Sequence, residues 1–273
     1  MHPFCFFDNK ITHINKAGLK INDLGVLRAT AVFEFLRTYD GKPFLFHEHF
    51  VRFINSAKLA GIPFNKKEKD VLKIVLKLIK LNKHKNVSIR FILTGGPSDK
   101  GLEIEKPLFY ILIERQSLLN PIVYKNGGKL ITVEYIRQLS RAKTTNYLVA
   151  VKNQKLKNKK GAVEILYTYK GKILEASTSN FFAVIKNNII TPRENILFGT
   201  TRNFVIKIAK GKFNIKEKDL KISDIKKLNE AFITATNKEI VPIVKIDNLK
   251  IGNGKPGKIT KQLIELFTKN KTV

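Results

Sequence analysis

Tryptophan is absent from this chain of 273 residues, and cysteine and acidic residues are scarce. The single cysteine, Cys5, excludes an internal disulfide framework and a cysteine-rich zinc site. No apolar run approaches the roughly 18 residues that a membrane-spanning helix needs. The first residues, Met-His-Pro-Phe, have neither the charged region nor the long apolar stretch of a signal peptide. These absences predict a cytoplasmic protein with no membrane partner.

Acidic residues are few relative to basic ones, 22 against 51, so the formal net charge is +29. A charge of this size raises the hypothesis of a nucleic-acid-binding protein. Two observations weaken it. The lysines are spread along the whole chain, and only nine of the basic residues are arginines, the usual readers of phosphates and base edges. We therefore expect a solvated, lysine-rich surface and no nucleic-acid partner.

The remaining composition is that of an ordinary globular protein, with 43% hydrophobic residues and enough length for one large domain or two medium ones. Strands are expected at 32–39, 86–94, 108–113, 130–136, 163–169, 180–185 and 231–235, and helices at 47–59, 66–81, 147–157 and 201–212. Because they do not alternate strictly, the pattern predicts an α+β (mixed α/β) fold. We expect a smaller N-terminal α/β domain (1–115), a connector (116–122) and a larger C-terminal domain (123–273).

Two short motifs suggest sites that their surroundings contradict. Residues 252–257, Gly-Asn-Gly-Lys-Pro-Gly, fit the dinucleotide-binding pattern G-x-G-x-x-G. Too few residues follow for the βαβ unit that such a site needs, and Pro256 removes a backbone donor, so we expect a turn. Residues 47–49, His-Glu-His, are metal-ligating types, but residues two apart on a helix point to different faces. We therefore expect no bound metal.

One longer stretch carries a specific order of residue types. Residues 174–182, Leu-Glu-Ala-Ser-Thr-Ser-Asn-Phe-Phe, place a carboxylate after an apolar residue and before a turn of small residues. Ile-Ile-Thr-Pro follows at 189–192, and Leu-Phe-Gly-Thr-Thr-Arg at 197–202 opens a predicted helix. This order resembles the signature of class IV aminotransferases, which are fold-type IV enzymes that depend on pyridoxal 5'-phosphate (PLP). The resemblance implies a two-domain fold like that of D-amino acid aminotransferase, PLP as cofactor, and a homodimer.

PLP needs a lysine that binds it covalently and an acid that keeps its pyridine nitrogen protonated. By the resemblance, Glu175 is the acid, and Lys143, in the segment Arg-Ala-Lys-Thr-Thr-Asn-Tyr of 141–147, is the catalytic lysine. Lys143 falls between a predicted strand and a predicted helix, where a loop can reach a cavity. The resemblance further implies that Lys143 moves the proton at the substrate Cα and that Tyr147 binds the phenolic oxygen of the cofactor.

A cup for the cofactor phosphate is also implied. The backbone N–H groups of Thr200 and Thr201 fall at a predicted helix N-terminus, and such ends bind anions through free donors and the helix dipole. Gly199 before them allows close approach of the backbone. By the resemblance, Arg52 in His-Phe-Val-Arg-Phe-Ile-Asn-Ser-Ala adds a guanidinium. The residues expected to hold the phosphate are Arg52, Gly199, Thr200, Thr201, Thr236 and Asn237.

The expected substrate-binding residues come from one subgroup of the family. Residues 27–34, Leu-Arg-Ala-Thr-Ala-Val-Phe-Glu, resemble D-amino acid transaminases in which an arginine replaces the usual aromatic residue. The resemblance assigns Arg28 and Arg90 to the substrate carboxylate, which a guanidinium binds bidentately. One face of the expected strand carries Val87, Ile89, Phe91 and Leu93. Arg90 therefore points to the other face.

Together these features predict a PLP-dependent transaminase that exchanges an amino group between an amino acid and a 2-oxo acid by a ping-pong mechanism. D-Amino acids are the favoured substrates. A branched-chain L-amino acid aminotransferase is the first alternative, and aminodeoxychorismate lyase is the next. A basic nucleic-acid-binding protein on the scaffold of an enzyme is the most distant alternative.

Overall fold

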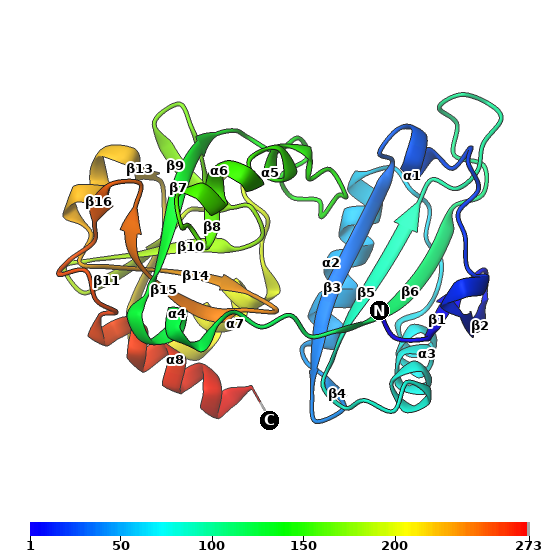
Figure 1. The fold of residues 1–273 in the computed structure, drawn as a ribbon, viewed down its shortest axis with the longest axis horizontal. Helices are drawn as coiled ribbons and strands as arrows, with labels where there is room; N and C mark the ends of the chain where they lie inside the picture. The colour runs from blue at the N-terminus through cyan, green and yellow to red at the C-terminus, as the bar shows by residue number, and fades with distance from the viewer. Residues whose placement is uncertain (272–273) are drawn as a thin grey trace. The chain divides into compact units, whose positions relative to one another are not determined.

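The computed structural model describes residues 1–271, which form two compact units (Figure 1). The first unit contains residues 1–117 and 141–146, and the second contains 118–140 and the chain from 147 onward. Both mix helices and strands, which confirms the expected α+β class. The domains predicted from the sequence remain a prediction. The predicted boundaries assign residues 141–146 to the C-terminal domain, whereas in the structure these six residues pack with the first unit.

The first unit is built on a six-stranded antiparallel sheet with the order β2-β1-β6-β5-β3-β4. Its strands are β1 (Phe4–Phe7), β2 (Lys10–His13), β3 (Ala31–Tyr39), β4 (Lys42–Pro43), β5 (Val87–Thr94) and β6 (Leu108–Arg115). Its helical segments are η1 (Ile14–Lys16), α1 (Leu24–Leu27), α2 (Phe46–Leu59) and α3 (Glu68–Leu81).

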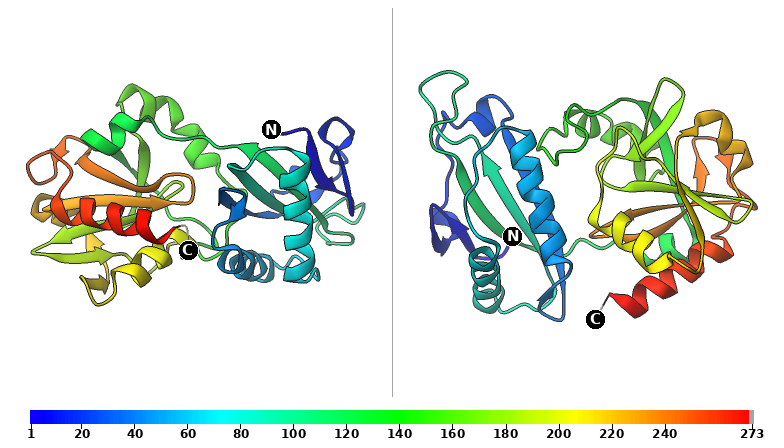
Figure 2. Two further views of the ribbon diagram at one scale, coloured as in Figure 1. Left: turned by 90° about the horizontal axis from the view of Figure 1, so that it is seen from below. Right: turned by 180° about the vertical axis from the view of Figure 1, so that it is seen from behind.

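Helices α2 and α3 pack on the same face of this sheet (Figure 2). Helix α2 buries an apolar stripe at helical spacing, which meets alternate residues of β3, β5 and β6. The residues of β5 in this core are Val87, Ile89, Phe91 and Leu93. The expected alternation is therefore confirmed. Strand β3 presents Val32 and Leu36 to the helices, so Glu34 between them has the same orientation, and Phe33 has the opposite one.

The second unit contains a ten-stranded mixed sheet, ordered β12-β11-β10-β14-β15-β7-β8-β9-β13, with β16 paired to β15. Its strands are β7 (Gly128–Glu134), β8 (Glu164–Tyr169), β9 (Lys172–Ala176), β10 (Asn180–Ile185), β11 (Asn188–Thr191), β12 (Asn214–Glu217), β13 (Leu220–Lys221), β14 (Glu230–Ala235), β15 (Glu239–Ile246) and β16 (Leu249–Lys250). Its helical segments are α4 (Pro121–Asn126), α5 (Leu148–Lys152), α6 (Gln154–Lys159), α7 (Thr200–Ala209), η2 (Ile222–Lys227) and α8 (Lys258–Asn270).

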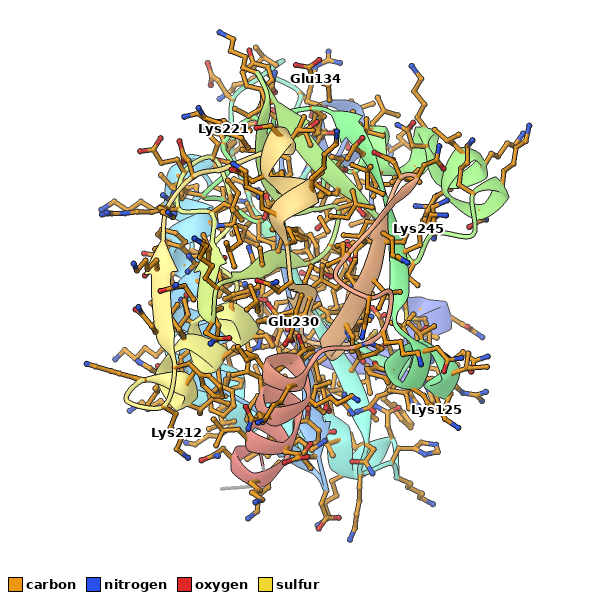
Figure 3. All side chains as sticks on the ribbon, turned by 90° about the vertical axis from the view of Figure 1, so that its left-hand side faces the viewer. Lys125, Glu134, Lys212, Lys221, Glu230 and Lys245 are labelled. Carbon is orange, nitrogen blue, oxygen red and sulfur yellow. The ribbon has the colours of Figure 1, made fainter. Side chains whose placement is uncertain are left out.

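Helices α7 and α8 pack together beside β14, with Phe204 and Phe267 in edge contact at 5.4 Å between ring centroids. The N-terminus of α8 is capped from the sheet. Glu230 accepts hydrogen bonds from the backbone N–H of Ile259 at 3.0 Å and of Thr260 at 2.8 Å. Figure 3 shows Glu230 at the start of this helix. A carboxylate there satisfies free donors and opposes the helix dipole.

The expected single helix at 147–157 is wrong, because the structure has two short helices there, α5 and α6. Asn153 lies between them, and its side-chain amide donates to the backbone carbonyl of Val149 at 2.8 Å. Asparagine side chains compete in this way for backbone groups and so interrupt helices.

Candidate active site

Three charged or titratable side chains meet between β3 and α2 in the first unit. Glu34 is fully buried, and its carboxylate accepts hydrogen bonds from the Arg52 Nε at 2.9 Å and from a second nitrogen of the same guanidinium. The His49 Nδ1 lies 3.0 Å from the same carboxylate. Residues 49 and 52 are three apart on the helix and therefore share a face. Arg52 is thus held in a fixed orientation by an acid that the sequence did not indicate.

Electrostatics explain how a carboxylate is kept in this apolar layer. Burial by itself raises the pKa of Glu34, but the Arg52 guanidinium and the His49 ring outweigh burial and hold that pKa well below its usual range. Burial lowers the pKa of His49, and the nearby cations of Arg52 and Lys143 lower it further against the opposing effect of Glu34. The His49 ring therefore takes up a proton less readily than a free imidazole, and its Nδ1 faces the Glu34 carboxylate.

Lys143 is held against β3 and α2 by its own backbone. Its carbonyl accepts from the N–H of Phe33 at 2.9 Å, and its N–H donates to the Ser56 hydroxyl at 3.0 Å. The next residue, Thr144, forms an antiparallel bridge with Val32. With its backbone fixed in this way, Lys143 extends its side chain over the ring of Phe33. The Lys143 Nζ lies 4.4 Å from the centroid of that ring.

Arg90 approaches the same aromatic ring from β5. The centre of its guanidinium lies 5.4 Å from the Phe33 centroid and 4.8 Å from that of Phe35. Two of its nitrogens donate to the two carboxylate oxygens of Glu114 on β6, one of them at 3.1 Å. Such a bidentate pair fixes the plane of the guanidinium. Arg90 and Lys143 therefore both contact Phe33.

Arg28 does not join this group through any hydrogen bond or ion pair within residues 1–271. It follows α1 as the C-cap residue, its side chain is exposed, and one guanidinium nitrogen donates to the carbonyl of Leu27 at 3.1 Å. Its expected role in carboxylate binding stays a prediction.

In the second unit, Glu175 near the end of β9 is buried and surrounded by donors. One carboxylate oxygen accepts from Nε of Arg137 at 2.9 Å and from a second nitrogen of that guanidinium at 2.7 Å. The other oxygen accepts from the backbone N–H of Leu197 at 3.0 Å. Burial lowers the pKa of Arg137, but the Glu175 carboxylate beside it outweighs burial and raises that pKa. The buried Glu175 carboxylate therefore has a cationic hydrogen-bond partner on one oxygen and a backbone donor on the other.

Tyr147 lies in the same unit as Glu175, directly before α5. Its phenol is near enough to contribute to the raised pKa of Arg137. The structure therefore brings Tyr147, Arg137 and Glu175 into one cluster, of which the sequence indicated the first and the third.

The backbone before α7 turns tightly around Asn180. Gly199 is the N-cap of α7, and a Cβ at this position would lie 2.1 Å from the Asn180 Oδ1. Thr200 and Thr201 begin the helix and are both buried. The first turn of α7 contains no acidic residue, and the N-cap makes no side-chain hydrogen bond. Neither α7 nor α8 has an acidic residue in its first turn, and α8 is capped instead by Glu230 of β14.

Thr236 and Asn237 occupy the turn between β14 and β15, where both are half-buried. Because Asn180 of β10 pairs with Thr234 of β14, this turn and the turn before β10 lie at the same end of the sheet. The described part of the chain gives neither the Thr236 nor the Asn237 side chain a hydrogen-bond partner. The two turns bring Glu175 and the expected phosphate residues 236 and 237 to one edge of the second unit.

Sequence reasoning missed the residues that pair with three of the expected site residues. The missed residues are Glu34, Glu114 and Arg137. Glu34 could have been found, because a carboxylate inside the apolar run of 32–36 needs a cation nearby. Glu114 and Arg137 lie 24 and 38 positions from their partners, which local patterns do not show.

Over residues 1–271 there is no group of three or more His, Cys, Asp and Glu side chains arranged to hold a metal ion. The same residues include no helix that is long and apolar enough to cross a membrane.

Comparisons with known proteins place the fold and these residues in context. The chain is 33% identical to a protein of Methanocaldococcus jannaschii provisionally named branched-chain-amino-acid aminotransferase, over 96% of this chain and 94% of that protein. It is 31% identical to the D-alanine aminotransferase of Staphylococcus aureus (strain N315), over 97% of this chain and 96% of that protein.

Solved structures have the same fold. The Escherichia coli branched-chain amino acid aminotransferase matches with a TM-score of 0.91 at 23% identity, over 99% of this chain and 95% of that chain. Another branched-chain amino acid aminotransferase, solved with pyridoxamine 5'-phosphate, also has a TM-score of 0.91 at 23% identity. The match covers 98% of this chain and 94% of that chain. The fold-type IV architecture expected from the sequence is thereby confirmed.

A family model described as amino-transferase class IV matches residues 31–246, which include Lys143, Glu175 and the start of α7. PLP is the cofactor of this family. With most of its length matched by that model and two relatives above 30% identity, the chain belongs to the class IV aminotransferases.

Proposed function

We propose that this aminotransferase exchanges an amino group between a D-amino acid and a 2-oxo acid by a ping-pong mechanism. One observation carries the assignment of an amino acid as substrate, without regard to its stereochemistry: Arg90, fixed by Glu114, and Lys143 both contact the ring of Phe33. An amino acid carries a carboxylate next to the Cα at which a proton must move. A guanidinium and an amine on one ring suit these two demands.

The residues of the second unit fit PLP by their chemistry. Glu175 is a buried carboxylate that Arg137 orients through two hydrogen bonds, and a carboxylate is the group that a protonated pyridine nitrogen requires. The buried first turn of α7 supplies backbone and hydroxyl donors with no acid of its own, as a phosphate requires. The buried Thr234 hydroxyl beside the 236–237 turn has no hydrogen-bond partner in residues 1–271, which leaves a further donor at this edge.

Bound PLP supplies an aldehyde for a covalent link to an amine and a protonated ring that draws electrons from the substrate Cα. In our proposal Lys143 provides the amine and then holds and moves the proton at Cα. Glu175 keeps the ring nitrogen protonated, and Tyr147 donates to the phenolic oxygen. Arg90, together with Arg28, binds the substrate carboxylate.

We assign the phosphate of PLP to backbone and side-chain donors. The proposed contacts are Arg52, Gly199, Thr200, Thr201, Thr236 and Asn237. Glu34 then orients Arg52, since it occupies the Nε and a second nitrogen of that guanidinium. A homodimer and a cytoplasmic location remain predictions of the family resemblance.

The preference for D-amino acids is supported by residues 27–34 and by the D-alanine aminotransferase of S. aureus, 31% identical. A branched-chain L-amino acid aminotransferase is the second candidate, supported by the M. jannaschii relative at 33% identity. The two differ in the face of the cofactor at which the proton moves. Aminodeoxychorismate lyase is a third, which pyruvate release from aminodeoxychorismate would reveal.

A panel of D- and L-amino acids, followed by the visible absorbance of bound PLP, tests the proposal. We expect D-alanine and D-glutamate to change the spectrum faster than L-leucine. The reverse order would favour the branched-chain alternative. Borohydride reduction of the PLP-loaded protein and peptide mass mapping should label Lys143, and Lys143→Ala should remove both label and turnover. A label on another lysine would contradict the assignment.

A further inference from the structure

A buried ion pair in the second unit is not used by the proposed chemistry. Glu164, the first residue of β8, is almost wholly buried, and its carboxylate lies 2.9 Å from the Nζ of Lys238. Lys238 follows Thr236 and Asn237 in the turn between β14 and β15. Its carbonyl also accepts from the Tyr124 hydroxyl at 3.0 Å, so the residue is held at both ends.

The same carboxylate gathers the turn between β9 and β10. It accepts from the Ser179 hydroxyl at 2.7 Å, from the Thr178 hydroxyl at 2.8 Å, and from the backbone N–H of Thr178. The Lys238 Nζ donates to that Thr178 hydroxyl at 2.7 Å. Thr178 therefore joins both members of the pair, and the network links two turns that are far apart in the sequence.

The electrostatics show a satisfied pair. Burial by itself raises the pKa of Glu164, but the Lys238 ammonium and the hydroxyl bonds from Ser179 and Thr178 outweigh it and lower that pKa. An ion pair with this many hydrogen bonds has a defined geometry, whereas removal of one partner leaves a buried charge uncompensated.

We infer that Lys238 and Glu164 are positioning residues, which hold the 236–238 turn against the 177–179 turn so that Thr236 and Asn237 can bind the phosphate of PLP. This inference rests on the proposed function. One turn carries the expected phosphate donors, and the other directly follows Glu175 and Ala176. A loosened pair would free the first turn while Glu175 stays bonded to Arg137 and Leu197. The lost binding affinity should therefore come from contacts to the phosphate of PLP more than from contacts to its pyridine ring.

Binding of PLP and of pyridoxal, which lacks the phosphate, separates these contributions. In the full-length apoenzyme, Lys238→Met should raise the Kd for PLP about tenfold, and that for pyridoxal by less than about threefold. Lys238→Arg, which keeps the charge, should restore most of the PLP affinity. Lys172→Met is the control, because Lys172 makes an exposed ion pair with Asp219, and neither residue lies in the two turns.

Thr178→Val removes only the shared hydroxyl and should raise the Kd for PLP by a smaller factor, so the test does not depend on a stable Lys238 variant. Equal losses for PLP and pyridoxal, or a lower Tm with both affinities unchanged, would overturn the inference by showing a purely structural pair. A wild-type protein that does not prefer PLP to pyridoxal would overturn the phosphate assignment as well. A wild-type preference that the variants retain would overturn the inference alone.

Discussion

Acidic residues are scarce in this chain, and three of them form ion pairs with arginines at or beside the candidate active site. Glu34 orients Arg52, Glu114 orients Arg90, and Glu175 is matched by Arg137. A guanidinium held by two hydrogen bonds loses little further freedom when it binds a ligand. The acids thus prepare positive groups in fixed directions, which a lysine-rich surface alone cannot do.

Arg90→Ala should raise the KM for amino acids about tenfold or more, because it removes a charged hydrogen-bonding partner of the substrate carboxylate. The absorbance of bound PLP should be unchanged. Arg115→Ala, at the exposed end of β6, is the control and should leave KM unaltered. Steady-state kinetics on both variants makes the comparison. If Arg90→Ala loses PLP instead, the carboxylate assignment is wrong.

Stability should fall as the pH decreases through the range below 6.5, in part because of His49. Its pKa is lower in the folded chain than the ordinary value of 6.5, chiefly through burial. The unfolded chain then binds the proton more readily, so the stabilising contribution is present above pH 6.5 and is lost as the pH falls toward the folded pKa. Burial also lowers the pKa of His2, which acts with the same sign.

Urea unfolding of His49→Gln between about pH 7.5 and 5 should therefore show a smaller loss of stability than wild type. His47→Gln, the same substitution at an exposed position on the same helix, is the matched control. A His49→Gln variant with an unchanged slope would show that this ring does not resist protonation.

The candidate residues could be predicted only where a local order of residue types was diagnostic. Lys143, Glu175 and the start of α7 fall within such stretches, and their roles stay predictions. Their partners could not be found in this way, because Arg137 lies 38 positions from Glu175, and Lys238 lies 74 from Glu164. Only the strand order and the turns of the folded chain bring these pairs together.

Regular periodicity decided which elements could be expected. Helix α2 and strand β5 show clear apolar periods, and both form where expected. Strand β15 is not among the strands predicted from the sequence, and it contains Pro242. It pairs with β14 along its length, but with β7 only from Ile243 onward. At Pro242 one side of the strand is therefore unpaired, and a missing N–H is tolerated there. Helix α8 was also missed, although Thr260, Leu263 and Phe267 are buried at helical spacing.

The junction between Gly199 and α7 offers a test at the scale of an element. Gly199→Ala should destabilise the protein by about 1–3 kcal/mol, because the new Cβ would meet the Asn180 Oδ1 at 2.1 Å. Asn180 cannot move freely, since its amide donates to the Leu197 carbonyl at 2.7 Å. The backbone of Gly199 has φ −63, so the cost is steric and not conformational.

Urea unfolding of the double variant Gly199→Ala with Asn180→Ala checks this reasoning. Removal of the Asn180 side chain removes the clash, so the second substitution should cost less in the Gly199→Ala background than in wild type. Strictly additive losses would show that the two side chains do not meet.

The surface of the whole molecule is dominated by one sign of charge. Figure 3 shows Lys125, Lys212, Lys221 and Lys245 extending outward from the second unit. With a net charge of +29, these side chains repel one another and disfavour the compact state. Salt screens such repulsion, since the Debye length is about 10 Å at 0.1 M.

The Tm should therefore rise by a few degrees as NaCl is increased from about 10 to 300 mM at neutral pH. Differential scanning calorimetry measures the shift. Replacing several exposed lysines with glutamine should raise the Tm at low salt and reduce its dependence on NaCl. A Tm that falls with NaCl would show that favourable ion pairs outweigh the repulsion.

The segment 141–146 belongs to the first unit although the chain on both sides of it belongs to the second. A gene split after codon 117 would yield an N-terminal fragment without the hexapeptide that bonds to Ala31, Phe33 and Ser56. The complementary fragment would carry that hexapeptide, with Lys143, detached from its partners. Neither fragment would contain all the residues of the first unit. Complementation between co-expressed fragments would depend on residues 141–146 of one fragment binding to β3 and α2 of the other.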